Sequence, residues 1–280
     1  MPVLLAPIEP SDLLVGYRDR VIQENTQDCM HYHDVYELIL VIQSQSMCFV
    51  GDRSYRFQDR SLLLIPPQKL HTIRYQTGTN YVLYVVNFSQ SFVQDVLNTV
   101  GESELLAELS ESECHGVQLS VGRFHQLHGL FHALYNSGQN IHNRSLAKSY
   151  LGVILQEAAK DFREAERPAL AAHQGVELVQ QVIGFIDQHF QEEITLEKLA
   201  DTFFVSKFHL SRMFSQITGS GVVNYIQCRR ILEAQKLLMQ GELNNQQISV
   251  LCGFESTQHF YRVFKKITGQ VPGNFRMPGL

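Results

Sequence analysis

The chain has 280 residues, of which 44% are hydrophobic and 18% charged, a composition typical of folded globular proteins and unlike that of disordered chains. No apolar run reaches the ~18 residues that a membrane-spanning helix needs, and the first residues lack the basic and apolar segments of a secretory signal. The five cysteines are scattered without a C-x-x-C pair, which argues against a disulfide framework or a cysteine zinc site and favours a reduced, cytoplasmic protein.

Short apolar segments in the first ~90 residues predict β-strands. The clearest are residues 37–42, 47–50, 61–65 and 81–88. Turn signals separate them, among them Gly51-Asp52 and the strand-ending Pro66-Pro67. Six to eight short strands at this spacing predict a barrel or a double-sheet jelly roll.

A group of polar residues accompanies these strands. His31, His33 and Glu37 have the same parity along a strand, and His71 follows later in the chain. Three interpretations stay open: a small-molecule pocket lined by these groups, a site for Fe, Mn, Zn or Ni, or histidines with structural hydrogen bonds alone. Further residues are either hydrogen-bond partners for a hydroxylated or anionic effector or surface residues: Arg53, Tyr55 and Arg74.

Helical patterns follow at residues 92–109, 121–137 and 144–162. In the second, His125, His128 and His132 lie on one side at spacings of three and four. They flank the expected buried stripe, so we interpret them as the rim of a helix at a dimer interface rather than as a metal site. A second candidate stripe for pairing two chains consists of Tyr150, Val153, Ile154 and Ala158. Residues 167–175 then form the expected interdomain linker.

Charge is unevenly distributed along the chain. From residue 203 to the end there are nine basic and three acidic residues, a net +6, which leaves −11 for the remainder of the total of −5. Such asymmetry indicates a polyanion-facing end on an acidic body.

The C-terminal hundred residues contain an internal repeat. Residues 205–219 and 255–269 align without gaps at an offset of 50, with Ser, His, Arg, Phe and Ile-Thr-Gly at matching places. Each copy predicts a helix that begins after Ser206 or Ser256, ends before Gly219 or Gly269, and carries one apolar stripe.

A shorter helix precedes each copy, at residues 195–203 and 246–252, and a longer one at 222–239 separates the two pairs. Two short helices joined by a tight turn form a helix-turn-helix unit. The polar faces carry residue types that suit base edges and phosphates. These candidate DNA contacts are Lys207, Phe208, Ser211, Arg212, Thr257, Gln258, Tyr261 and Arg262.

Residues ~180–277 resemble the DNA-binding domain of the AraC/XylS family of bacterial transcription regulators. The shared motifs are Leu199-Ala200, Ser206-x-x-x-Leu210-x-Arg212-x-Phe214, Arg229-Arg230, Ala234, Gly253-Phe254, Phe260, and Phe264-Lys265-x-x-x-Gly269-x-x-Pro272-x-x-Phe275-Arg276. Two places depart from the pattern, Ser249 after Ile248 and the bulky Phe203-Phe204 at the first turn. The resemblance implies base contacts by Phe208, Ser211 and Arg212 in one unit and by Thr257, Gln258 and Arg262 in the other.

The histidines and Glu37 also resemble the metal motif of the cupin fold, although the glycines that flank that motif are missing here. Regulators of the resembling family carry a cupin-like sensor, often with similar residues and no metal, and the helices after it pair two chains. The resemblance therefore implies an effector site in the barrel and a homodimer.

We thus expect an α+β protein. Residues 1–165 would form a cupin-like β-barrel with a helical dimerisation arm, 166–176 a linker, and 177–280 an all-α domain with two helix-turn-helix units. The expected function is a ligand-responsive, sequence-specific transcription regulator of a metabolic operon, with carbohydrate metabolism as the family habit. Its expected partners are double-stranded DNA, a small-molecule effector and, if it activates, RNA polymerase, with no membrane and no certain cofactor. Our main expectation is a regulator without enzymatic activity. The alternative is a metal-dependent cupin enzyme or metal sensor that uses His31, His33, Glu37 and His71.

Overall fold

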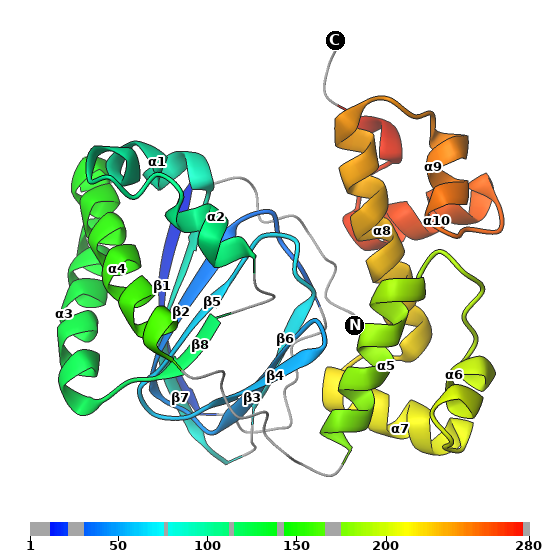
Figure 1. The fold of residues 1–280 in the computed structure, drawn as a ribbon, viewed down its shortest axis with the longest axis horizontal. Helices are drawn as coiled ribbons and strands as arrows, with labels where there is room; N and C mark the ends of the chain where they lie inside the picture. Colours follow the sequence, from blue (N-terminus) through cyan, green and yellow to red (C-terminus); the bar gives the residue numbers. More distant parts are fainter. Residues whose placement is uncertain are drawn as a thin grey trace.

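The computed structural model describes residues 12–21, 31–75, 78–111, 115–138, 143–165 and 175–276. A β-rich N-terminal domain and a helical C-terminal domain lie side by side (Figure 1). The α+β class expected from the sequence is confirmed. Most of the expected linker lies outside the described residues.

Two antiparallel sheets form the N-terminal domain. The larger sheet has the order β1 (Leu13–Val21), β7 (Asn80–Phe88), β2 (Tyr36–Gln43), β5 (Ser61–Ile65) and β8 (His115–Gln118). The smaller sheet has the order β4 (Arg53–Phe57), β3 (Ser46–Val50) and β6 (His71–Tyr75). The short β8 was not foreseen, because its four residues carry no alternation that separates them from a loop.

Strand β2 explains why its sequence is an unbroken apolar run. Ile39 and Val41 face the smaller sheet and join the core between the sheets. Leu38 and Leu40 face the other way and join the core under the helices. Because both faces are covered, alternation with polar residues disappears.

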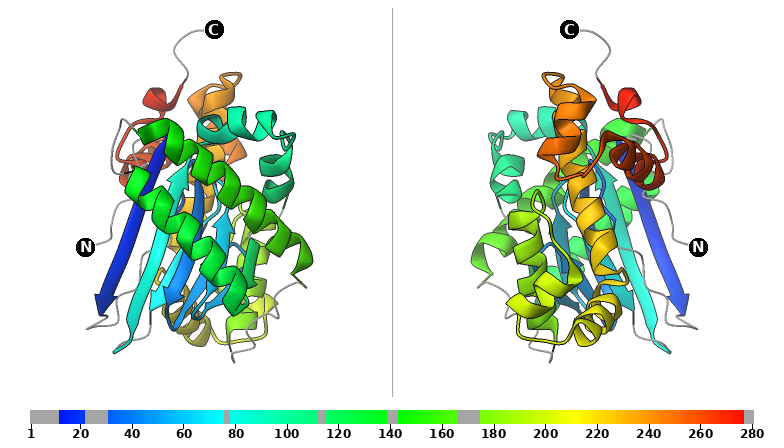
Figure 2. Two further views of the ribbon diagram at one scale, coloured as in Figure 1. Left: turned by 90° about the vertical axis from the view of Figure 1, so that its left-hand side faces the viewer. Right: turned by 90° about the vertical axis from the view of Figure 1, so that its right-hand side faces the viewer.

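Four helices cover the outer face of the larger sheet: α1 (Gln90–Thr99), α2 (Leu105–Ser110), α3 (Val121–Gly138) and α4 (Arg144–Glu164). Figure 2 shows α3 and α4 side by side across that face. The single helix predicted for residues 92–109 is wrong. Gly101, with a φ of 81°, ends α1 in a left-handed turn, and α2 begins separately at Leu105.

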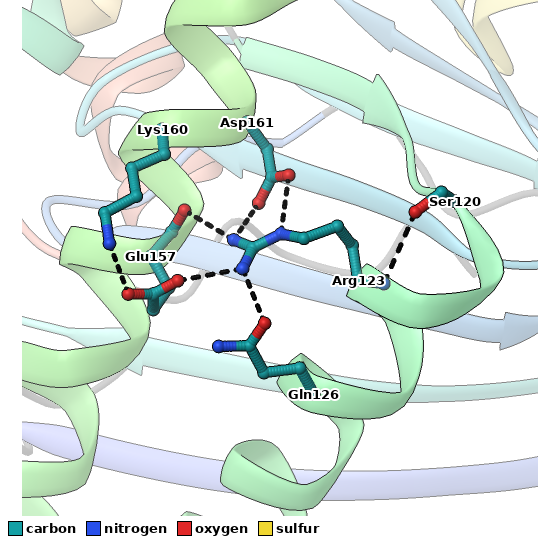
Figure 3. A network of polar contacts seen from close by, with 6 residues as sticks. All are labelled: Ser120, Arg123, Gln126, Glu157, Lys160 and Asp161. Atoms are coloured by element: carbon teal, nitrogen blue, oxygen red, sulfur yellow. Dashed lines mark hydrogen bonds and ion pairs between the residues drawn. The ribbon is translucent and has the colours of Figure 1, made fainter.

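One arginine ties α3 to α4 (Figure 3). Arg123 donates from Nε and Nη2 to the carboxylate of Asp161, at 3.0 and 2.6 Å. Its Nη1 donates to Glu157 Oε2 at 2.8 Å and to Gln126 Oε1 at 2.7 Å. A bidentate pair that is largely shielded from solvent is among the stronger polar contacts in proteins.

The C-terminal domain contains α5 (Val176–His189), α6 (Leu196–Thr202), α7 (Lys207–Thr218), α8 (Val222–Gln240), α9 (Asn245–Leu251), α10 (Thr257–Thr268) and the 3-10 helix η2 (Pro272–Phe275). All its helices contribute to one apolar cluster, in which Phe214 and Phe264 occupy matching places of the repeat. No helix within the described ranges has both the length and the apolarity needed to span a bilayer.

The two domains are in contact through the smaller sheet. Phe49 of β3, together with Tyr32 and Leu70, belongs to the apolar cluster of the C-terminal domain. Polar contacts accompany them: Gln180 Nε2 of α5 donates to Ser54 Oγ at 3.0 Å, and the Tyr32 hydroxyl donates to Gln235 Oε1 of α8. The order through the molecule is therefore helices, larger sheet, smaller sheet and C-terminal helical domain (Figure 1).

Candidate effector site and nucleic-acid interface

Three of the residues singled out in the sequence meet at one end of the double-sheet barrel. His33 precedes β2, Glu37 is the second residue of β2, and His71 is the first residue of β6. A backbone bridge between His31 and His71, with N···O distances of 2.9 and 2.8 Å, joins the two segments. The ring centroids of His31 and His71 are 4.2 Å apart, so His31 lies beside the group, although its ring nitrogens are not among the ligand atoms that converge.

Backbone carbonyls orient both imidazoles. His33 Nδ1 donates to Val35 O and His71 Nδ1 donates to Lys69 O, both at 2.8 Å. The Nε2 atoms therefore face the carboxylate, at 3.2 and 3.1 Å from Glu37 Oε2. The His71 contact is close without the geometry of a hydrogen bond.

The three groups shift one another's protonation. Burial acts to raise the pKa of Glu37, yet the hydrogen bond from His33, the close contact with His71 and the charge of both histidines hold it well below its usual range. Burial acts to lower the pKa of His33, but Glu37 outweighs it and raises the pKa above its usual value. At neutral pH the site therefore holds a carboxylate anion that attracts positive charge.

The remaining predicted ligand-site residues do not join this group. Arg74 is exposed on β6, and Arg53 is half-buried at the start of β4, near His115. The ring of Tyr55 belongs to the apolar core between the sheets.

Sequence reasoning missed Asn87. It lies directly opposite Glu37 in the pairing of β7 with β2, so the two side chains share a face of the sheet. Asn87 is only 6% exposed, and its Oδ1 has no hydrogen-bond partner among the residues that the structure describes. Only the strand register reveals this position, because nothing in the local sequence around Asn87 marks it.

The histidine row of α3 does not form a comparable group. Within the described ranges, one group of at least three His, Cys, Asp or Glu residues has ligand atoms that all lie within 4.8 Å of one another, and it consists of His33, Glu37 and His71. His132 instead has its Nδ1 3.2 Å from the Tyr84 hydroxyl. The pKa of His128 is lowered by burial and by the neighbouring histidines.

The stripe proposed on α4 for pairing two chains is partly wrong. Ile154 and Ala158 are fully buried within their own domain, because this face of α4 packs on the core over the larger sheet. Val153 and Leu146 are the exposed apolar residues of α4, at 43% and 48% exposure.

The C-terminal repeat is reproduced in detail by the structure. Ser206 Oγ accepts from the amide of His209 at 3.2 Å, and Ser256 Oγ accepts from that of His259 at 3.1 Å. Gly219 and Gly269 end the two helices with φ values of 71° and 75°. Equivalent side-chain caps also begin α6, at Thr195, and α9, at Asn244. The two units lie along α8, one towards each end (Figure 1).

The predicted DNA-contacting side chains lie on the outer faces of α7 and α10. Six of the eight are exposed, while Ser211 and Thr257 are half-buried. Lys207 pairs with Glu197 at 2.9 Å, and the Tyr261 hydroxyl accepts from Asn245 Nδ2 at 2.5 Å. Arg212 and Arg262 form no ion pair with any residue that the structure describes. Two unneutralised guanidinium groups at matching places suit contact with a polyanion.

The paired arginines of α8 have a structural role instead. Arg230 donates to the carbonyls of Phe190 and Glu192, both at 2.7 Å, and so fixes the end of α5 on α8. Arg229 pairs with Glu233 at 3.2 Å. Part of the positive charge seen in the sequence therefore holds the domain together.

Comparison with known proteins assigns both domains. The model of the AraC-like ligand binding domain matches residues 14–155, and that of a helix-turn-helix domain matches residues 199–277. The chain belongs to the AraC family of transcription regulators. Its two matched domains make it a ligand-responsive transcription regulator, as the sequence predicted.

Similar curated proteins are regulators over most of this chain's length. An uncharacterised HTH-type transcriptional regulator of Bacillus subtilis, YfiF, is 26% identical over 88% of this chain and 78% of its own. The HTH-type transcriptional activator RhaS of Pectobacterium carotovorum is 26% identical over 88% of this chain and 86% of its own. The crystal structure of apo ToxT from Vibrio cholerae has 14% identity and a TM-score of 0.44, covering 95% of this chain and 97% of its own. The two matched domains and the two regulators similar in sequence do not favour the alternative of a cupin enzyme.

Proposed function

We propose that α7 and α10 read DNA from adjacent stretches of the major groove. Their proposed contacts are Lys207, Phe208, Ser211, Arg212, Thr257, Gln258, Tyr261 and Arg262. The observation that carries the proposal is that both copies of the repeat present an exposed arginine at the same place, on a helix whose opposite face is buried in the core of the domain. A packing role alone would not keep both guanidinium groups in solvent.

The rigid spacer supports simultaneous reading by both units. Helix α8 is continuous from Val222 to Gln240 and contacts both α7 and α10. Successive major grooves on one side of B-DNA are ~34 Å apart. Two units held at a fixed separation by one spacer helix can enter both grooves at once.

The test uses duplexes selected by the full chain from a random pool, followed by fluorescence anisotropy at fixed salt. Arg212→Ala and Arg262→Ala should each weaken binding to the selected sequence by about 1–3 kcal/mol, because each removes a bidentate contact to a base. Arg18→Ala removes the same charge from an exposed place on β1 and should leave binding unchanged. Equal affinities of all four proteins would contradict the proposed interface.

The proposed effector contacts lie at the barrel end that holds His31, His33, Glu37 and His71. His33 and His71 of this group are buried, and Tyr32 and Leu70, which directly precede them, pack against the DNA-binding domain. An effector that prefers one arrangement of the two domains would shift the population of DNA-binding molecules. Arg53, at the start of β4, and His71 both pair with Val50 of β3, so Arg53 is a peripheral candidate for effector contact. The exposed Arg74 is not part of this proposal.

We infer that two chains pair through the outer side of α3 and α4, which lies away from the DNA-binding domain (Figure 2). Leu146 and Val153 are the exposed apolar residues of α4 on that side of the domain. A homodimer would place four reading helices on DNA and raise affinity through effective concentration. Sedimentation velocity of the full chain decides between one and two copies.

The proposed setting is the bacterial cytoplasm, where a regulator meets chromosomal DNA. The similarity to a protein named as a transcriptional activator supports activation, and hence contact with RNA polymerase. Transcription from a promoter that contains the selected site, measured with and without the chain, gives the sign of regulation.

A further inference from the structure

Three atoms that carry lone pairs converge at the end of the barrel. The Nδ1 atoms of His33 and His71 must be protonated, because each donates to a backbone carbonyl that can only accept. In a neutral imidazole the Nε2 atom is then an acceptor. Both Nε2 atoms face the carboxylate of Glu37, which is also an acceptor. Buried acceptors in contact require a positive centre between them.

A proton on one imidazole or a metal ion can supply this centre, and the spacing of the atoms is compatible with a metal ion. Charge-assisted hydrogen bonds between nitrogen and a carboxylate are typically about 2.7–2.9 Å long. The two contacts here are longer, 3.2 and 3.1 Å, and the second lacks hydrogen-bond geometry. Two donor atoms that each lie ~2.1 Å from one metal ion are about 3.0–3.4 Å apart at octahedral or tetrahedral angles. The observed distances lie in this range, and only the His33 contact also has the geometry of a hydrogen bond.

Asn87 supplies an independent observation. Its side chain is buried on the same face of the sheet as Glu37, one strand away, and its Oδ1 has no partner in the described chain. A buried carbonyl oxygen without a donor is costly, at about 1–3 kcal/mol. Amide oxygens are ligands for divalent cations, either directly or through a bound water.

The surroundings of the two histidines also match a metal site. Metal-bound imidazoles commonly donate their second ring N–H to a backbone carbonyl, which fixes both the tautomer and the ring orientation. Val35 O and Lys69 O accept in this way. The histidines of α3 serve as an internal comparison, since three of them lie close together in sequence but form no convergent group within the described ranges.

We propose that His33 Nε2, His71 Nε2 and the Glu37 carboxylate bind one divalent transition-metal ion, with Asn87 Oδ1 beside it. Two imidazoles and a carboxylate suit Zn²⁺, Fe²⁺, Mn²⁺, Co²⁺ or Ni²⁺. Three protein ligands leave positions at which an effector with oxygen or nitrogen donors can coordinate. This role in effector capture rests on the proposed sensing function, whereas metal binding itself does not.

The experiment titrates the full chain, stripped with a chelator, with Co²⁺ and follows the visible d–d absorption, with Zn²⁺ as competitor. One equivalent should bind. Glu37→Gln, which keeps the shape of the side chain, and His71→Ala should each weaken binding by at least about tenfold, since even neighbours of metal ligands matter by that factor. His125→Ala is the matched control on α3 and should bind as the unaltered chain does.

Circular dichroism shows whether each variant is folded. If His71→Ala does not fold, the Co²⁺ affinity of Glu37→Gln alone decides the outcome. Equal affinity of the unaltered chain and Glu37→Gln would overturn the proposal, as would a loss seen only with His125→Ala. The result is independent of the DNA interface, because Arg212→Ala should bind Co²⁺ unchanged even where it fails to bind duplex DNA.

Discussion

Phe204 adopts a left-handed backbone conformation, with a φ of 55°, in the turn between α6 and α7. The second unit has Gly253 at the equivalent place, with a φ of 78°. In both turns the next residue donates its amide back to the first helix, from Val205 to Ala200 O at 3.0 Å and from Phe254 to Ser249 O at 2.9 Å. The repeat thus forms the same turn twice, without backbone strain at Gly253 and with strain at Phe204.

The Phe204 ring is 96% exposed, so it contributes no packing that would offset this strain. Phe204→Gly should therefore raise the free energy of unfolding by about 1 kcal/mol, the lower end of the cost of such backbone strain. Urea denaturation measures it. Phe208→Gly is the control, because Phe208 is also largely exposed but helical, and its replacement should lower stability by about 1 kcal/mol. A destabilised Phe204→Gly protein would show that the ring stabilises the turn.

Asn87 shows where residue-level reading of the sequence stops. The histidines and Glu37 were visible as a pattern because they are chemically unusual and lie at alternating positions. Asn87 became visible only through its pairing with Glu37 across two strands fifty residues apart in sequence. Strand register depends on the packing of both faces of the sheet, which a single segment does not encode.

At the scale of elements, the Arg123 network holds α3 and α4 together (Figure 3). Asp161 and Glu157 are only 12% and 18% exposed, so removing Arg123 takes the guanidinium partner from two shielded carboxylates and leaves Glu157 with Lys160 alone. Arg123→Ala should lower the free energy of unfolding by about 2 kcal/mol, as expected for charge-assisted hydrogen bonds. Arg144→Ala breaks an ion pair whose members are about half exposed and should cost under ~1 kcal/mol.

The same network predicts a pH dependence. Lys160 and Arg123 lower the pKa of Glu157 below its usual 4.5. A lowered pKa in the folded state stabilises the protein fully above 4.5, and this contribution is lost as the pH falls through the folded-state pKa. The difference in stability between the unaltered chain and Arg123→Ala should therefore shrink in acid. A difference that stays constant from neutral pH to well below 4.5 would contradict an electrostatic origin.

Element boundaries followed from local signals where the caps were recognised in the sequence, whereas the cap Asn244 of α9 was missed and its helix was predicted one residue late. Ser206, Ser256, Gly219 and Gly269 placed α7 and α10 correctly. The region after β7 failed because apolar periodicity continues across Gly101, which the chain uses to reverse direction. Periodicity reports which face is buried, not whether the helix is continuous.

The whole molecule is organised by the docking of the DNA-binding domain on the smaller sheet. Phe49 is 2% exposed and packs within the apolar cluster of the C-terminal domain. Phe49→Asp buries a charge in that contact, so the domains should separate and the radius of gyration in small-angle X-ray scattering should increase. Leu14→Asp places the same charge on an exposed residue of β1 and should leave it unchanged.

An unchanged radius in Phe49→Asp, with both domains still folded by circular dichroism, would show that docking depends on other contacts, such as those of Tyr32 and Gln180. The test bears on signalling as well. Tyr32 and Leu70, which take part in docking, directly precede His33 and His71 of the polar group.

The sequence by itself determined the two-part organisation, the duplicated reading unit and the residues that each unit presents. These features arise from short-range rules, namely helical periodicity, caps and an internal repeat. Only the tertiary structure decided that three of four polar candidates meet, that Arg74 stays outside, that Asn87 lies opposite Glu37, and that the smaller sheet contacts the DNA-binding domain. Such facts depend on contacts between residues distant in sequence, whose partners are selected by the packing of the complete chain.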